Sequence, residues 1–426
     1  MEKLNLNPEA PEPGRVDRHL HALDYVRNEL GNDEKKFESI IRNVQTLQVA
    51  IPSWALGTGG TRFGRFPGGG EPRNLEEKIE DIALLSELSR ATQSISLHIP
   101  WDIPKDTTAI RQKLGHYGLF IDSVNSNTFQ DQEGQLHSYK FGSLCHLDND
   151  VRKQAIAHNL EVIEYGKALG TSSLTIWLSD GSNFPGQHHF RKVYEKTLDS
   201  LKFIYQALPE DGSLLLEYKP YEPNFYSMVI PDWGTSYTLC QACGKKANVL
   251  VDLGHHLPNT NIEQIVSRLL HLGRLGGFHF NGSQYGDDDL TTGVVKPFQL
   301  FLIFLELVFG KAEGLDNPKV AYMIDASHNT KDPLEDLLDS LENIRTAYAK
   351  ALLVDREKLV QVQEKNDVVE AEKILRNAFL TDVRPLVTEA RIRAGGFWDP
   401  LGTFRGQDIR KKLISIRGEK SLATGL

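Results

Sequence analysis

Near its middle the chain reads Asn248-Val-Leu-Val-Asp-Leu-Gly-His-His256. The first part of this stretch, Asn248–Leu253, is a short run rich in β-branched and aliphatic residues, which predicts a strand. Asp252 then stands at the end of the strand, and His255 stands in the first turn of the loop that follows. A hydrophobic strand therefore ends on ionisable side chains, and the same arrangement recurs on both sides of it.

Eight segments predict strands of this kind. They are Leu47–Ile51, Ser94–His98, Leu119–Val124, Ser173–Trp177, Leu214–Tyr218, Asn248–Leu253, Gly277–Asn281 and Val320–Asp325. Helix-length segments lie between most of them, as crossovers between parallel strands require. Eight β/α units over about 300 residues predict the α/β class and a (β/α)8 TIM barrel. A doubly wound open sheet, the alternative, would concentrate glycines after its first strand, whereas this chain has ionisable groups after almost every strand.

The remaining segments predict helices appended to the barrel. Asp17–Thr46 has apolar residues at helical spacing, and Glu335–Ala390 is a long, charge-rich helical region that ends near Pro385. Gly395–Leu426 reads as a basic tail without a core. We therefore expect an N-terminal helical extension (1–46), a catalytic barrel (47–353), and a C-terminal helical extension and tail (354–426) that makes subunit contacts.

Composition and charge exclude several classes of protein. The 426 residues include 48 Lys and Arg against 57 Asp and Glu, a formal charge of −9, so a nucleic acid is not the expected partner. Three cysteines are too few for a secreted disulfide scaffold and predict a reducing compartment. The N-terminal residues lack the pattern of a signal peptide, and no apolar run reaches the roughly 20 residues that cross a bilayer. We expect a cytoplasmic protein that does not bind membranes.

Ligand-type side chains gather at the ends of strands five to eight. Glu217 and Lys219 are two residues apart on one strand, so both face the same side of the sheet. Asp252, His279 and Asp325 stand at the next three strand ends. Three carboxylates and a histidine, without thiolates, predict a hard or borderline divalent cation rather than a structural zinc ion.

A second set of residues, His255, Asp287 and Asp289, could hold another ion beside the first. The charges agree with two ions, because five carboxylates in the two sets would be offset by two divalent cations and Lys219. Each residue alone has a simpler interpretation: an acidic strand-end residue as a helix cap, the 287–289 loop as a polar turn, or His279 as a core histidine. Their joint occurrence at successive strand ends favours the metal site.

These residues lie in motifs that resemble the L-rhamnose isomerase family of sugar isomerases, in the branch with relaxed aldose specificity. The motifs run in order through nearly the whole chain: Val49-Ala-Ile-Pro-Ser-Trp54, Gly57-Thr-Gly-Gly-Thr-Arg-Phe63, Ser96-Leu-His-Ile-Pro-Trp101, Asn125-Ser-Asn-Thr-Phe129, Asp180-Gly-Ser-Asn-Phe-Pro-Gly186, Val251-Asp-Leu-Gly-His-His256, Gly277-Phe-His-Phe-Asn281, Gly286-Asp-Asp-Asp289, Met323-Ile-Asp325 and Ser327-His-Asn329.

The resemblance implies two divalent ions per subunit, manganese first, with cobalt or magnesium as alternatives. It implies that the structural ion, which also holds the sugar, is bound by Glu217, Asp252, His279 and Asp325, and that the catalytic ion is bound by His255, Asp287 and Asp289. His98, Trp177 and Lys219 would contact the sugar and, with Asp325, carry the reaction. Phe63 would reach the active site of a neighbouring subunit in a homotetramer.

The implied activity is aldose–ketose isomerisation of L-rhamnose and L-rhamnulose, and of other pairs such as D-allose and D-psicose. Trp177, Phe129 and Phe63 would exclude water, which favours a hydride shift between C1 and C2. A sugar epimerase on a similar barrel is the alternative, but it needs a pair of glutamates and only Glu217 is well placed. A hydrolase of DNA phosphodiesters would need a basic groove, and a silent sugar-binding barrel would have lost ligands that are all present.

His188 and His189 have no evident partner in the sequence and are expected at the surface.

Overall fold

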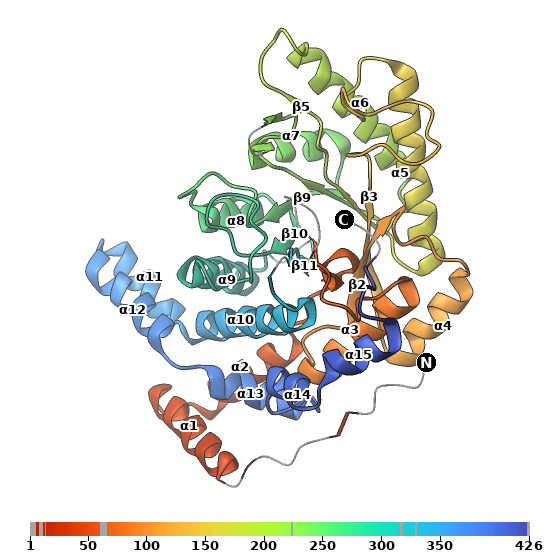
Figure 1. Ribbon diagram of the computed structural model, residues 1–426. Coiled ribbons are helices and arrows are strands. Elements are labelled where there is room, and N and C mark those ends of the chain that lie inside the picture. The colour runs from red at the N-terminus through yellow and green to blue at the C-terminus, as the bar shows by residue number, and fades with distance from the viewer. Residues whose placement is uncertain are drawn as a thin grey trace.

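The computed structural model describes residues 6–7, 12, 14–59, 66–222, 225–315, 318–328 and 330–423. Within this part of the chain, eight parallel strands follow one another around a barrel (Figure 1). Their bounds, in order around the barrel, are β1 (Ile51–Pro52), β2 (Ser94–Ile99), β3 (Phe120–Ser126), β4 (Ser173–Ile176), β6 (Ser213–Glu217), β9 (Ala247–Asp252), β10 (Leu275–Phe280) and β11 (Ala321–Ile324). The barrel closes where Ala50 N–H donates to the Tyr322 carbonyl (2.7 Å) and Ile324 N–H to the Ala50 carbonyl (3.1 Å). The predicted (β/α)8 TIM barrel is confirmed.

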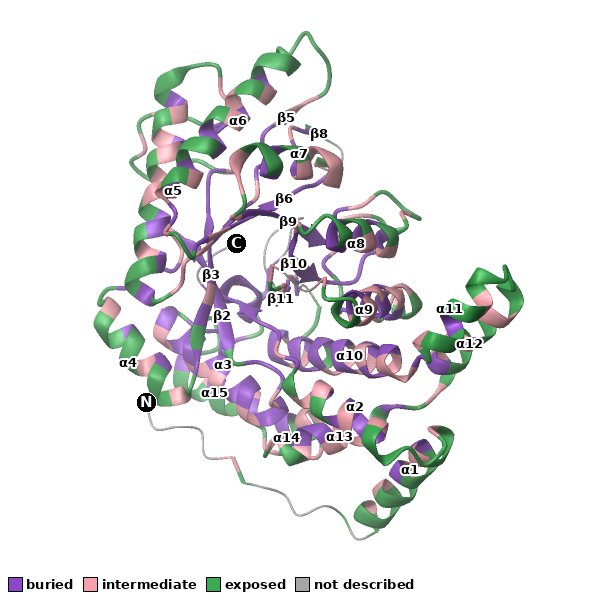
Figure 2. Cartoon of the chain, turned by 180° about the vertical axis from the view of Figure 1, so that it is seen from behind, coloured by how far each residue is buried: buried purple, intermediate pink, exposed green. Residues whose placement is uncertain are grey.

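Helices form the outer layer of the barrel. They are α3 (Leu75–Ser89), α4 (Thr107–Tyr117), α5 (Asn149–Leu169), α6 (Phe190–Ala207), α7 (Trp233–Cys243), α8 (Ile262–His271), α9 (Pro297–Ala312) and α10 (Pro333–Leu353). Most begin at a side chain that accepts a hydrogen bond from the first turn, such as Asn74 for α3 and Asp106 for α4. Figure 2 shows the result: the strands and the inner faces of the helices are buried, and the outer faces are exposed.

The N- and C-terminal extensions consist of more and shorter helices than the sequence predicts. The predicted helix at 17–46 divides into α1 (Arg15–Glu29) and α2 (Glu34–Thr46), because Gly31 and Asn32 adopt left-handed conformations, with φ of 66° and 59°. Glu335–Ala390 is likewise interrupted, into α10, α11 (Arg356–Glu364), α12 (Val368–Leu380) and α13 (Arg384–Arg393). Pro385 lies in the first turn of α13, so it begins a helix rather than ending one.

The tail after Gly395 has a core, contrary to expectation. It forms α14 (Pro400–Gly406) and α15 (Ile409–Arg417), which bury Phe404, Ile409 and Leu413. The buried Arg417 guanidinium donates to both carboxylate oxygens of Asp81 on α3, at 2.8 and 2.7 Å. The sparse apolar residues of the tail pack onto the barrel, which composition alone does not show. The division at residues 46 and 353 and the subunit contacts of the extensions stay predictions.

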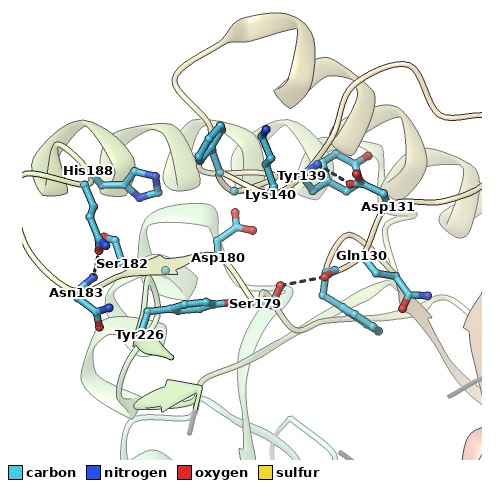
Figure 3. A pocket seen from close by; sticks show the side chains of 15 residues that line it. Gln130, Asp131, Tyr139, Lys140, Ser179, Asp180, Ser182, Asn183, His188 and Tyr226 are labelled. Carbon is cyan, nitrogen blue, oxygen red and sulfur yellow. Dashed lines mark hydrogen bonds between the residues drawn. The ribbon is translucent and has the colours of Figure 1, made fainter. Parts of the chain in front are cut away.

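A small antiparallel sheet, absent from the predictions, lies above the barrel. It consists of β5 (Gly181–Ser182), β8 (Tyr226–Met228) and β7 (Tyr221–Glu222) and joins the loop after β4 to the loop after β6. Ser182 and Tyr226 of this sheet line a cavity shown in Figure 3. No helix in the described ranges is long and apolar enough to cross a membrane.

Candidate active site

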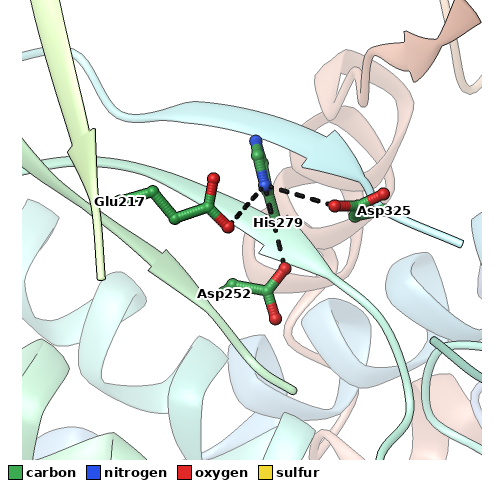
Figure 4. A group of neighbouring side chains, drawn as sticks. All are labelled: Glu217, Asp252, His279 and Asp325. Atoms are coloured by element: carbon green, nitrogen blue, oxygen red, sulfur yellow. Dashed lines mark hydrogen bonds and ion pairs between the residues drawn. The ribbon is translucent and has the colours of Figure 1, made fainter. Parts of the chain in front are cut away.

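Glu217, Asp252, His279 and Asp325 meet at the carboxyl end of the barrel (Figure 4). Glu217 is the last residue of β6, Asp252 is the last of β9, and the parallel register pairs His279 of β10 with Asp252. Asp325 follows β11, and its N–H donates to the Phe280 carbonyl at 3.0 Å. One ligand atom from each of these four residues lies within 4.8 Å of all the others, so the predicted group is brought together.

The spacing of this group fits a bound cation. His279 Nδ1 lies 3.2 Å from Glu217 Oε1, 3.7 Å from Asp252 Oδ2 and 3.6 Å from Asp325 Oδ2. Burial and the neighbouring carboxylates raise the pKa of Asp325 to about 7. Although burial opposes it, the charge of Glu217 raises the pKa of His279 to about 9. Without a metal ion the group therefore retains protons on His279 and Asp325, and a divalent cation would displace these protons.

The second predicted set lies beside the first. His255 Nε2 is 2.9 Å from Asp287 Oδ1, and His255 Nδ1 is 3.1 Å from Glu217 Oε1. Lys219 Nζ donates to Asp287 Oδ2 at 2.6 Å. Asp289 instead accepts a hydrogen bond from Ser327 Oγ at 3.0 Å. In the described parts of the chain the first group alone has three or more ligand atoms mutually within 4.8 Å, so this set shares the site without converging on one point.

The loop that carries Asp287 and Asp289 is built around the residue between them. Asp288 accepts hydrogen bonds from the N–H groups of Gln284 (2.9 Å) and Gly286 (2.7 Å). Asp287 and Asp289 both have left-handed backbones, with φ of 56° and 48°. Such conformations are costly for residues other than glycine and concentrate at functional sites. The loop therefore holds two carboxylates at the barrel mouth at the expense of backbone strain.

Aromatic side chains wall the other side of a cavity of about 220 Å³ above these groups; they are Trp54, Trp101, Phe129 and Trp177. His98 lies among them, with ring centroids 4.2 Å from Trp101 and 5.4 Å from Phe129. Burial lowers the pKa of His98 to about 3, so its ring is neutral. His98 Nδ1 and Trp177 Nε1 are buried and have no hydrogen-bond partner among the described residues. An apolar wall with unpaired polar atoms suits a ligand that has hydroxyl groups. The predicted Phe63 lies outside the described residues.

Several residues of the site were not predicted. Trp54 Nε1 donates to Asp325 Oδ1 at 2.8 Å, and Glu222 Oε2 accepts from Lys219 Nζ at 2.9 Å. The carboxylates of Asp287 and Glu222 raise the pKa of Lys219 against its burial. Trp54 is the last residue of the motif Val49-Ala-Ile-Pro-Ser-Trp54, so the sequence did contain a signal for its role. Glu222 belongs to the β7–β8 hairpin, and its position depends on a small sheet that no strand pattern indicated.

Comparison with known proteins assigns the fold to a family. The profile of the family described as the xylose isomerase-like TIM barrel matches residues 88–328. The chain belongs to this family. It is 51% identical to a probable sugar isomerase of Rhizobium meliloti (strain 1021), covering 96% of this chain and 95% of the relative. It is 50% identical to a probable sugar isomerase of Mesorhizobium japonicum, covering 95% and 90%.

Solved structures agree with the family at the level of fold. A structure of L-ribulose 3-epimerase superposes with a TM-score of 0.51 at 13% identity, covering 73% of this chain and 98% of that chain. The expected relation to sugar-isomerase barrels is confirmed for the xylose isomerase-like family. The narrower resemblance to L-rhamnose isomerases gains no support from these relatives.

Proposed function

We propose that this chain is a metal-dependent aldose–ketose isomerase. The observation that carries the proposal is the convergence of Glu217, Asp252, His279 and Asp325 beside the Lys219 ammonium, in a pocket walled by aromatic rings. Membership of the xylose isomerase-like family and two half-identical relatives named probable sugar isomerases support an isomerase.

Two divalent ions, manganese first and cobalt or magnesium as alternatives, complete the proposed site. The converging group would hold one ion, and His255, Asp287 and Asp289 would hold the other, displacing the contact between Lys219 and Asp287. Bound there, the ions would polarise the C1 and C2 oxygens of an open-chain sugar. Buried carboxylates lie close together at this mouth and repel one another. This repulsion is the observation that fits such ions.

The reaction moves the C2 hydrogen with its electron pair to C1, and one proton from the C2 oxygen to the C1 oxygen. Lys219, freed from Asp287, would stabilise the negative charge that develops on the C1 oxygen. His98, which is neutral, and Trp177 would hold sugar hydroxyls through their unpaired ring nitrogens. Phe129 and the tryptophans exclude water, which favours a hydride shift over an enediol that exchanges with solvent.

The proposed substrates are L-rhamnose and L-rhamnulose, together with pairs such as D-allose and D-psicose. They follow from the resemblance of the sequence motifs. We include in the proposal a homotetramer in which Phe63 of one subunit completes the aromatic wall of another.

The alternative is a sugar epimerase, and one observation favours it. Glu222 lines the same cavity as Glu217 and supplies the second glutamate that the sequence did not reveal. However, the Glu222 carboxylate contacts Lys219 and is not part of the proposed metal-binding group of Glu217, Asp252, His279 and Asp325. An isomerase therefore accounts for more of the site.

The test is a metal add-back assay on the purified protein. After chelation, Mn²⁺, Co²⁺ or Mg²⁺ is restored and a panel of aldoses is examined for ketose formation. We expect no turnover without metal and turnover with manganese or cobalt. A stripped protein that keeps its activity would disprove the metal assignment. The same assay in deuterated water tests the hydride shift, because complete deuterium incorporation at the product carbon would exclude it.

A further inference from the structure

A second and larger cavity, of about 610 Å³, lies beside the metal pocket. Its walls come from the loop after β3, from the segment between β4 and α6 that includes β5, and from β8 (Figure 3). Phe129 lines both cavities, so the two sites share one aromatic wall.

The cavity is held open by specific packing. Asp180 is buried and accepts hydrogen bonds from the N–H groups of Ser143 (2.8 Å) and Cys145 (3.1 Å), which fix the loop after β3 against β5. The Tyr226 ring lies directly on Gly181, where any side chain would collide with it. Ser179, next to Asp180, donates to the Phe129 carbonyl at 3.4 Å and ties the shared wall to this cavity. The shape is therefore built into the fold.

The lining has the chemistry of a carbohydrate site. Phe141 is 60% exposed and presents a ring face, with Lys140 Nζ 4.9 Å from the ring centre. The side chains of Asn183 and His188 also line the cavity (Figure 3). His188 Nδ1 is a buried atom without a hydrogen-bond partner in the described chain. His188 is half-exposed and lines the cavity, and the exposed His189 caps α6, so both lie at the surface as expected.

The charge of the lining selects among polar ligands. Asp131 and Asp180 supply two carboxylates and Lys140 one ammonium, so no positive charge is in excess for a phosphate or a carboxylate. Aromatic faces combined with amide, hydroxyl and imidazole groups suit a ligand with both C–H faces and hydroxyl groups. A neutral sugar has this chemistry.

We propose that this cavity is a second binding site for a neutral sugar, packed against Phe141 and hydrogen-bonded by His188. The inference rests on the proposed function, since it takes the metal pocket to be the first sugar site. The occupant is either a separate monosaccharide or the distal ring of a disaccharide whose reducing end enters the metal pocket past Phe129.

The first experiment measures binding to the metal-stripped full chain, in which the metal pocket cannot hold sugar through metal ions. L-Rhamnose and maltose are titrated by calorimetry and saturation-transfer NMR. We expect wild type to bind sugar. The Phe203→Ala control should bind it equally well, because Phe203 is about as exposed as Phe141 (55%) but lies on α6 outside the cavity. Phe141→Ala and His188→Leu should each weaken binding by about tenfold. Melting temperatures confirm that the variants are folded.

The second experiment separates the two occupants in the metal-loaded enzyme. If maltose is converted to its ketose and kcat/KM falls about tenfold in the cavity variants, the occupant is a distal ring. If maltose is not converted while stripped protein still binds L-rhamnose through Phe141 and His188, the occupant is a separate sugar. Equal binding in wild type and both cavity variants, or no binding to the stripped protein, would overturn the proposal. If metal-loaded wild type shows no isomerase activity while the stripped protein still binds sugar through Phe141 and His188, the proposed function alone is rejected.

Discussion

The ammonium of Lys78 lies 2.6 Å from a carboxylate oxygen of Asp102, and both side chains are fully buried behind the aromatic wall of the candidate active site. The other oxygen of Asp102 accepts a hydrogen bond from the His98 N–H at 2.8 Å and another from Ser53 Oγ. Helix α3 thereby fixes the backbone of a residue that faces the proposed substrate. Asp102 acts through His98, so we regard it as a positioning residue.

Replacing Lys78 by Met should therefore be costly. The variant leaves the Asp102 carboxylate buried without its counter-ion, and we expect the free energy of unfolding to fall by about 3–5 kcal/mol. Urea unfolding measures the change. The double variant Lys78→Met/Asp102→Asn removes the stranded charge and should recover part of the loss. A single variant that unfolds at the urea concentration of wild type would show that the pair does not hold this region.

The half-buried Asp122 on β3 should make stability depend on pH. Burial raises its pKa to about 6, opposed by a hydrogen bond from Ser96 Oγ. Since the folded pKa is above the unfolded value, this carboxyl contributes stability below about pH 4, and the contribution is lost as the pH rises through 6. Asp122→Asn should thus become more stable relative to wild type at alkaline pH, by at most about 3 kcal/mol. Urea unfolding at several pH values measures this, with the exposed Asp17→Asn as control. A constant difference between Asp122→Asn and wild type would contradict it.

Trp54 should tune metal binding through Asp325. Its indole N–H donates a hydrogen bond that orients the Asp325 carboxylate. Removing such a supporting hydrogen bond typically costs 10–100-fold in metal affinity or activity. We therefore expect Trp54→Phe to lower the Mn²⁺ affinity or the activity by about 10–100-fold. Competition with a fluorescent chelator gives the Mn²⁺ affinity. Trp398→Phe, remote from the site, is the control and should bind Mn²⁺ as wild type does. Unchanged affinity and activity in Trp54→Phe would remove Trp54 from the site.

Lys219→Met should lower kcat far more than it raises KM. The ammonium is proposed to stabilise charge that develops in the transition state, and loss of one such group costs about 10²–10³ in kcat. Steady-state kinetics with manganese bound measures both constants. Glu222→Gln keeps the ammonium and should be much less affected. A rise in KM at constant kcat would mean that Lys219 only binds the sugar.

Most of the barrel could be predicted because two sequence signals mark each strand: an aliphatic run, and polar residues at the end of that run. β1 was the exception: its ladder covers only Ile51 and Pro52, since the chain turns at once into a short 3-10 helix (Ser53–Leu56). Glu217, Asp252, His279 and Asp325 could be predicted together, because carboxyl ends of parallel strands must meet. Glu222 and the place of His188 in the second cavity could not, because these positions depend on the small β5–β8–β7 sheet and the loops it joins. Short antiparallel strands of two or three residues leave almost no pattern in a sequence.

The central claim is that the site interconverts an aldose and a ketose with metal bound. The most direct measurement is carbon-13 NMR of L-rhamnose and D-allose labelled at C2, incubated with the chelated protein before and after Mn²⁺ or Co²⁺ is restored. We predict that, only after metal is added, the C2 signal moves to the position of a ketose anomeric carbon. No change in either aldose with metal bound would contradict the account.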